Sequence, residues 1–151
     1  MKRFTILKLL IAFLMMLCCG TAMASDFVTV DGFKFLVDTD KDEATLLANG
    51  YSGEVFVPEK VLFEGKEYLV TTLGEKCFGS TVTKVHIPNT VKKLGARSFY
   101  NSGVKTIEIP NSVTSLDDEC FAESSLREIQ LPNSIKSFGY QIHGAPLRET
   151  G

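Results

Sequence analysis

The chain has 151 residues, with 16 Lys and Arg against 18 Asp and Glu and a formal net charge of −2. This length suits a single domain. The acidic balance disfavours nucleic acid and anionic membrane surfaces as partners, because both are bound through a basic face that releases counterions.

The N-terminus has the parts of an export signal. A basic start (Lys2, Arg3 and Lys8) precedes an apolar run at residues 9–17, and Ala22-Met23-Ala24 supplies small residues for a signal peptidase. We therefore predict a signal peptide at residues 1–24 and an exported protein that is secreted, periplasmic or on the cell surface. Because the apolar run is shorter than the ~20 residues that span a bilayer, no membrane insertion is expected after signal removal.

A lipoprotein anchor is the alternative, since Cys18 and Cys19 lie in the same region. It is disfavoured because neither cysteine follows the small residue that lipidation requires: Leu17 precedes the first and Cys18 the second. Cleavage after Ala24 leaves 13 basic and 18 acidic residues, a formal charge of −5, which strengthens the exclusion of polyanionic partners.

Residues 25–72 predict an N-terminal β cap and a divergent first coil. Apolar residues alternate in short runs that start at Phe27, Phe33 and Ala44. Asp31-Gly32 is a two-residue hairpin signal, and Glu64-Gly65-Lys66 predicts a second turn. Val55-Phe56-Val57-Pro58 repeats the ending of the later units, so this segment is expected to form the first coil. Such a cap covers the end of a repeat stack and keeps it soluble.

From residue 73 to residue 146 the chain repeats one pattern. Units start at Val82, Val104 and Leu126, a spacing of 22, and Leu147 follows 21 residues later. Apolar residues at the first, fourth and sixth positions, followed by Pro-Asn, are typical of a leucine-rich repeat solenoid. The predicted fold is β-rich with short helical or irregular turns, with about four coils behind an N-terminal β-hairpin cap.

The repeats resemble the BspA-like, or treponemal-type, leucine-rich repeats, whose usual wording is L-x-x-I-x-I-P-x-x-V-x-x-I-G-x-x-A-F. The wording is matched in two consecutive units by Val85, Ile87, Pro88, Val91, Leu94, Gly95 and Phe99, and by Ile107, Ile109, Pro110, Val113, Leu116 and Phe121. The sequence departs from it at Asp117 (usually Gly), Phe138 (usually aliphatic) and His143 (usually Phe). The last unit is therefore expected to be degenerate. The resemblance implies a cell-surface protein of host-associated bacteria or protists that binds host matrix proteins or other cells.

Residues between the inward-facing positions of each unit predict one solvent-facing sheet surface, because strand side chains alternate. Solenoids commonly bind partners on such a surface. The candidate partner-binding residues are Lys84, His86, Thr106, Glu108, Glu128 and Gln130.

The proline of each unit is expected to end its strand, since proline lacks the N–H of the ladder. The asparagine behind it (Asn89, Asn111 and Asn133) is expected to form a stacked ladder whose amides satisfy backbone groups at the turn. A row of ligand contacts is the alternative interpretation.

Cys77 and Cys120 are the two cysteines left after signal removal, and each directly precedes the Phe of its unit. Ser98 holds that position in the coil between them. Two coil spacings of about 4.8 Å exceed the roughly 7 Å that a disulfide can bridge between Cα atoms. We therefore predict two buried free thiols.

No catalytic, metal or cofactor site is predicted. The segment Asp38-Thr39-Asp40-Lys41-Asp42 has the acidic spacing of a calcium loop, but Glu43 replaces the turn glycine and Asn49 the bidentate Glu. A solvated hairpin turn is the preferred interpretation. The chain has neither a nucleophile elbow nor a glycine-rich phosphate loop, and the sequence identifies no acid partner for His86.

The sequence thus predicts a non-catalytic recognition or adhesion module whose partner is a protein or glycan at a cell or matrix surface. The competing class is a structural unit or shortened relative that self-associates through its C-terminal coil edge, because residues 147–151 restart a repeat without a visible cap. An enzyme, such as a hydrolase, is disfavoured because no nucleophile, base and orienting group can be named together.

Overall fold

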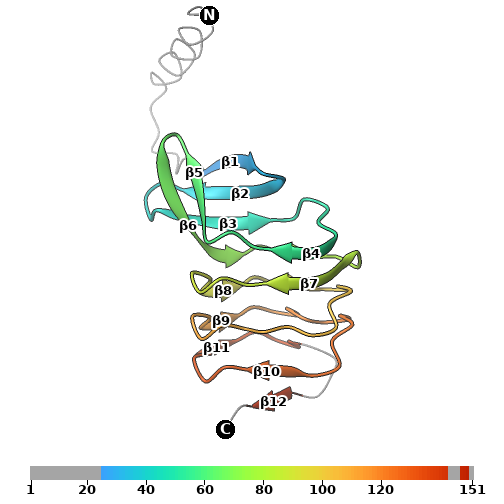
Figure 1. Ribbon diagram of the computed structural model, residues 1–151. Coiled ribbons are helices and arrows are strands. Elements are labelled where there is room, and N and C mark those ends of the chain that lie inside the picture. Colours follow the sequence, from blue (N-terminus) through green and yellow to red (C-terminus); the bar gives the residue numbers. More distant parts are fainter. Residues whose placement is uncertain (1–24, 143–146, 150–151) are drawn as a thin grey trace, which may run out of the picture.

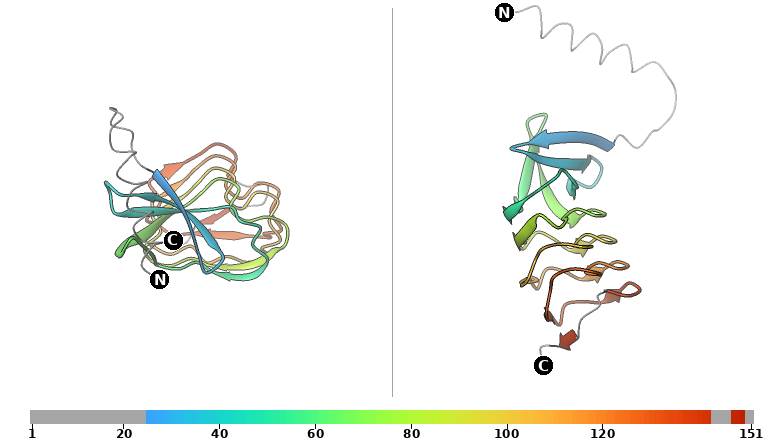
Figure 2. Two further views of the ribbon diagram at one scale, coloured as in Figure 1. Left: turned by 90° about the horizontal axis from the view of Figure 1, so that it is seen from above. Right: turned by 90° about the vertical axis from the view of Figure 1, so that its right-hand side faces the viewer.

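The computed structural model describes residues 25–142 and 147–149. The predicted signal peptide at residues 1–24 and the departure at His143 lie outside these ranges. The described residues form a β-solenoid of about four turns and contain no helix, which confirms the predicted fold class. Figures 1 and 2 show the coils stacked along one axis, with a small twisted sheet at the N-terminal end.

Two hairpins with tight two-residue turns belong to the N-terminal sheet. Strands β1 (Ser25–Val30) and β2 (Phe33–Asp38) are antiparallel, and the turn residues Asp31 and Gly32 both have positive φ, 49° and 80°. That pair of values is the conformation that a two-residue hairpin turn requires. Strands β5 (Lys60–Phe63) and β6 (Lys66–Leu73) form the second hairpin, with its turn at Glu64 and Gly65. Both predicted turns are confirmed.

Strand β3 (Glu43–Leu47) joins this cap to the solenoid. It pairs antiparallel with β2 on one edge and parallel with β6 on the other. The change from antiparallel to parallel pairing occurs at β3, and every later pairing between coils is parallel.

One side of the solenoid carries a continuous parallel ladder, which we call the ladder side. It consists of β6 and three two-residue strands, β8 (Lys93–Leu94), β9 (Ser115–Leu116) and β11 (Ser137–Phe138). The residue after each strand also bonds to the preceding coil: Gly95 N–H donates to Leu73 O at 2.7 Å. A Cβ on Gly95 would lie 2.6 Å from the same oxygen, so the close approach of the coils requires glycine there.

A second corner of the coils is also bonded without interruption. Phe78, Phe99 and Phe121 are fully buried, with ring centroids 4.9 and 5.1 Å apart from one coil to the next. Their backbone N–H groups donate to Ser98, Cys120 and Ile142 of the following coil at 2.7–2.9 Å. The phenylalanine column therefore fixes the coil spacing in the core.

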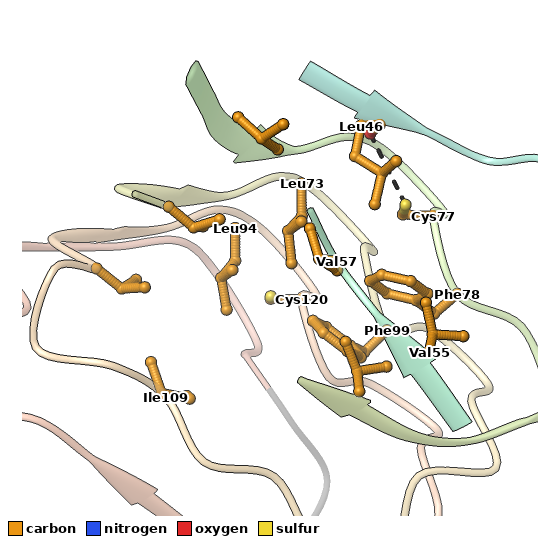
Figure 3. Close-up of a cluster of buried hydrophobic side chains, with 14 of the residues drawn as sticks. Leu46, Val55, Val57, Leu73, Cys77, Phe78, Leu94, Phe99, Ile109 and Cys120 are labelled. Atoms are coloured by element: carbon orange, nitrogen blue, oxygen red, sulfur yellow. Dashed lines mark hydrogen bonds between the residues drawn. The ribbon is translucent and has the colours of Figure 1, made fainter. Parts of the chain in front are cut away.

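The two cysteines lie beside this column and are buried and free, as predicted (Figure 3). Cys77 Sγ lies 3.7 Å from Leu46 O, and Cys120 Sγ lies 3.1 Å from the hydroxyl of Ser98. Burial raises the pKa of each thiol to about 12. Neither thiol is in the ionised form that makes cysteine reactive.

The third side of the solenoid is split. Strand β4 (Gly53–Phe56) pairs with β7 (Val82–His86), and β10 (Ile129–Leu131) pairs with β12 (Leu147–Glu149). The central coil between these pairs, residues 103–109, makes no backbone hydrogen bond to any described residue. The expectation of one continuous sheet surface on this side is therefore wrong for the central coil.

The expected asparagine ladder is also absent from the described residues. Asn89, Asn111 and Asn133 are exposed, and no hydrogen bond of their side chains to a described residue occurs. The turn is closed by the main chain instead, since Val91 N–H donates to Pro88 O at 3.1 Å and the next two units repeat this bond.

Candidate functional site

The candidate site is the exposed surface of the split side. Lys84 and His86 lie on β7. Gln130 lies on β10, and Glu128 directly precedes that strand. Thr106 and Glu108 lie on the unpaired central segment. All six predicted residues expose their side chains at least partly. Figure 1 shows β4, β7, β10 and β12 along one side of the solenoid, opposite the ladder strands β8, β9 and β11. Thr106 and Glu108 lie between β7 and β10 on this side, since Glu108 shares one hollow with Lys84 and His86 and another with Gln130.

Glu54 on β4 brings Lys84 and His86 into one cluster. Its Oε1 atom lies 3.1 Å from Lys84 Nζ and 2.7 Å from His86 Nε2. The hydrogen bond from His86, followed by that from Lys84, lowers the pKa of the Glu54 carboxyl below its ordinary value. The carboxylate is therefore the ionised centre of the cluster at neutral pH, and it faces solvent.

Phe56 covers the imidazole of His86. The two rings are stacked, with centroids 4.1 Å apart and planes inclined by 3°, and Phe56 remains 62% exposed. Its exposed face is an apolar platform beside the charged atoms of Glu54 and Lys84. An exposed aromatic ring with adjacent charged groups is typical of the centre of a protein interface.

Sequence reasoning missed Glu54 and Phe56, although a signal was present. Aligning Pro58 with Pro88 sets Glu54 opposite Lys84 and Phe56 opposite His86, which is the observed β4–β7 register. The alignment was obscured because the β5–β6 hairpin is inserted between the two coils and lengthens the first repeat.

Two hollows lie on either side of the central segment. The first, of about 500 Å³, separates it from β7 and is lined by Lys84, Val85, His86, Ile87, Asn89, Thr106, Ile107, Glu108 and Pro110. The second, of about 590 Å³, separates it from β10 and repeats several of these positions one coil later, including Asn111, Gln130 and Pro132. Glu108 belongs to both hollows.

The chemistry of this surface favours binding. In the described part of the chain, the hydrogen bond of His86 goes to Glu54, and no serine, threonine or cysteine bonds to the imidazole. A nucleophile of the kind that a histidine–acid pair would activate is therefore not placed there. Within the described ranges, no group of three or more His, Cys, Asp or Glu side chains is arranged to hold a metal ion. The described residues also include no helix long and apolar enough to cross a membrane.

The parallel coils, the buried aliphatic and phenylalanine columns and the 22-residue period together define a leucine-rich repeat protein. Residues 66–143 match the family described as BspA type leucine rich repeat region, in six copies. The chain therefore belongs to this family. This membership confirms the resemblance that the repeats suggested. No curated protein matches the chain significantly.

Solved structures agree with the family assignment. A leucine-rich repeat protein from Bacteroides capillosus ATCC 29799 is 27% identical, with a TM-score of 0.71 over 83% of this chain and 99% of its own. A leucine-rich repeat protein from Bacteroides ovatus ATCC 8483 is 19% identical, with a TM-score of 0.54 over 77% of this chain and 38% of its own. The T. pallidum leucine-rich repeat protein is 18% identical, with a TM-score of 0.54 over 76% and 64%. The last two share the fold alone.

Proposed function

We propose that this protein is an exported, non-catalytic recognition module that binds a protein at a cell or matrix surface through its split side. The contact residues are Lys84, His86, Thr106, Glu108, Glu128 and Gln130, extended by Glu54 and Phe56. The family is one of surface proteins commonly involved in protein recognition. The export signal at the N-terminus supports a location where such a partner is met.

The exposed Phe56–His86 stack carries this proposal. Phe56 is 62% exposed, so its ring contributes little to the core, and the solenoid is held together on its other sides. Burying such a ring against a partner contributes free energy that the isolated protein does not use, and aromatic residues dominate the energetic centres of protein interfaces. The surrounding charged groups can orient a partner by electrostatic complementarity.

A binding panel tests the proposal. The purified protein is screened by biolayer interferometry against purified extracellular matrix proteins, with surface glycans as a separate arm. We expect saturable binding to one protein. This binding should be lost in Phe56→Ala and in the triple variant Lys84→Ala/His86→Ala/Glu108→Ala. Phe27→Ala is the matched control, because Phe27 is 68% exposed on the distant strand β1. Binding to glycans alone, or binding that survives both site variants, would overturn the proposal.

A second candidate function is self-assembly through the C-terminal coil. Phe138 occupies the ladder position of the buried Leu94 and Leu116 but is 55% exposed, and Tyr140 beside it is 71% exposed. Strand β11 pairs with β9 and with no other described strand. An exposed strand edge with apolar side chains favours association with another chain. A molar mass that rises with concentration in light scattering and is reversed by Phe138→Ser would support this candidate; a constant monomer mass would eliminate it.

A further inference from the structure

The central segment, residues 103–109, carries backbone groups that are free for pairing. None of its N–H or C=O groups bonds to a described backbone or side-chain group. The alternation of exposed Thr106, half-buried Ile107, exposed Glu108 and buried Ile109 is that of an extended strand. Backbone groups of folded proteins are almost always paired or solvated, so these groups must be satisfied by water in the free protein.

The opening of the coils around this segment is confined to a few residues. At its first residue, Gly103, the segment packs closely on the preceding coil, since a Cβ there would lie 2.5 Å from Ser80 O and 2.8 Å from Val82 O. After it, Thr114 N–H donates to Lys92 O at 2.8 Å. The segment is therefore anchored at both ends, and the separation from β7 and β10 is a local feature of an otherwise bonded stack.

The facing strand β7 also presents backbone groups toward the opening. In a parallel pair the N–H and C=O of one residue point to the same neighbouring strand, and alternate residues point to opposite sides. His86 O accepts from Val57 N–H of the first coil, so the backbone groups of Val85 and Ile87 face the central segment. Both of these residues line the first hollow. That hollow is thus bordered on two sides by edges of extended chain.

Its size and spacing fit an extended polypeptide. Volumes of about 500 and 590 Å³ fall in the range of about 300–1,000 Å³ typical of ligand sites. Free groups on an extended segment recur every second residue, or about 6.6–6.8 Å, which is the repeat of another extended chain. His86 supplies the aromatic ring among the lining residues, and the apolar lining is otherwise aliphatic or proline, so stacking platforms for sugars or bases are few.

The charge of the opening selects a basic side chain. Lys84 is paired with Glu54, whereas Glu108 has no ion pair or hydrogen bond to a described residue and belongs to both hollows. The neighbouring Lys105 is exposed but lines neither hollow. A carboxylate without a partner, beside free backbone groups, favours a Lys or Arg side chain of a bound peptide.

We propose that residues 103–109 are a docking edge for an extended peptide segment of the protein partner. The peptide bonds through its main chain to the free groups of the central segment and places a Lys or Arg on Glu108. This is recognition by strand addition, in which main-chain bonds give affinity and alternate side chains give specificity. The inference rests on the proposed function and names the part of the partner that is bound.

Hydrogen exchange of the free protein is the first test. Backbone amides of residues 105–109 should exchange at close to the rates of an unstructured chain, while those of Val91, Thr114 and Phe99 are protected. Protection of 105–109 equal to that of β7 would show a closed sheet without a docking edge, and would overturn the inference.

Peptide binding is the second test. The probe is a capped octapeptide of alternating threonine and lysine, and binding is followed by amide chemical shifts and by slowed exchange at residues 105–109. We expect at least tenfold weaker binding for the same peptide methylated on its threonine nitrogens, which keeps the charge and removes main-chain donors. A threonine–glutamate octapeptide should not bind. Equal binding of the methylated peptide would overturn the inference.

Protein variants complete the design. Thr106→Pro removes an N–H that bonds to no described residue, so the protein should fold normally and lose peptide binding tenfold or more. Thr106→Val loses the hydroxyl but keeps the N–H, and should therefore weaken peptide binding less than Thr106→Pro. Glu108→Gln should weaken lysine-peptide binding by about threefold to tenfold, and Glu59→Gln, a change at an exposed carboxylate outside both hollows, should not.

The two proposals fail differently. If the binding panel yields a protein partner that Phe56→Ala abolishes and Thr106→Pro leaves unchanged, the strand-addition inference is wrong and the recognition function stands. If neither variant affects the partner, both proposals are wrong for this surface.

Discussion

The ladder side and the split side are built from the same four coils, yet they differ in how the coils are joined. On the ladder side, strands β6, β8, β9 and β11 pair in sequence and the intervening loops bond as well. On the split side, pairing stops at the central coil and resumes only between β10 and β12. The contrast teaches that the central coil is held in the stack through the ladder and the phenylalanine column, without backbone bonds to described residues on the split side.

The largest expected difference in stability between the two sides is at the phenylalanine column. Phe99→Ala removes a fully buried ring that lies between Phe78 and Phe121, and should lower the free energy of unfolding by about 3–5 kcal/mol. Phe56→Ala removes an equally large ring from the exposed split side and should change stability by no more than about 0.5 kcal/mol. Urea unfolding of the two variants checks the difference, and equal losses would contradict the division of roles.

The second prediction concerns alkaline pH and the thiols beside that column. Burial raises the pKa of Cys77 and Cys120 from 9.0 to about 12, so between these values the unfolded chain loses two protons that the folded chain keeps. The associated stability is complete well below pH 9 and falls as pH rises above it, approaching about 3 kcal/mol per pH unit for both thiols together once the unfolded thiols are ionised.

Urea unfolding at pH 8, 9 and 10 under reducing conditions measures this slope. In the double variant Cys77→Ala/Cys120→Ala, the free energy of unfolding should decrease much less between pH 9 and 10 than in the parent protein. Tyr51 contributes little to the decrease in this range, because its pKa is raised from an ordinary 10.0 to about 12. An identical pH profile for the variant and the parent protein would refute the buried-thiol account.

The third prediction tests the close approach on the ladder side. Gly95→Ala places a Cβ 2.6 Å from the backbone oxygen of Leu73 and should cost about 1–3 kcal/mol, because backbone cannot give way as a flexible side chain can. Gly79→Ala is the matched control, since nothing lies within 4 Å of its Cβ, and it should be neutral or slightly stabilising. Thermal unfolding of the pair is sufficient. A neutral Gly95→Ala would show that the ladder is looser than its hydrogen bonds imply.

The sequence alone predicted the fold because the buried positions recur with the coil. The 22-residue period, the hairpin at Asp31-Gly32 and the buried thiols all follow from local patterns that the structure bears out. The asparagine ladder was a wrong prediction for a physical reason: the turn is closed through the main chain by the bond from Val91 N–H to Pro88 O, and the Asn89 side chain bonds to no described residue.

The candidate site was harder to predict, because it depends on pairing between distant residues. Glu54 and His86 are 32 residues apart and meet only because β4 and β7 pair around an inserted hairpin. The split itself leaves no mark in the sequence, since Thr106 and Glu108 alternate with Ile107 and Ile109 in the same way as the residues of the bonded strand β7. Alternation indicates which side chains face the core, but it does not show whether neighbouring coils are bonded.

The smallest expected effect tests whether ion pairs, rather than backbone bonds, distinguish the two sides. Lys93 Nζ lies 2.8 Å from Asp117 Oδ2 across two coils of the ladder side, and a double-mutant cycle with Lys93→Met and Asp117→Asn should give a coupling of about 0.2–1 kcal/mol. The coupling between Lys84 and Glu54 on the split side, measured in the same way, should be no larger, because these side chains are more exposed.

Both couplings should shrink in 1 M salt, where the screening length is about 3 Å. If the pair on the ladder side proved several times stronger than the pair on the split side, charge would contribute to holding the coils together there. Weak coupling on both sides would leave the backbone ladder and the phenylalanine column as the cause of the difference, and would show that Lys84 and Glu54 contribute little to stability.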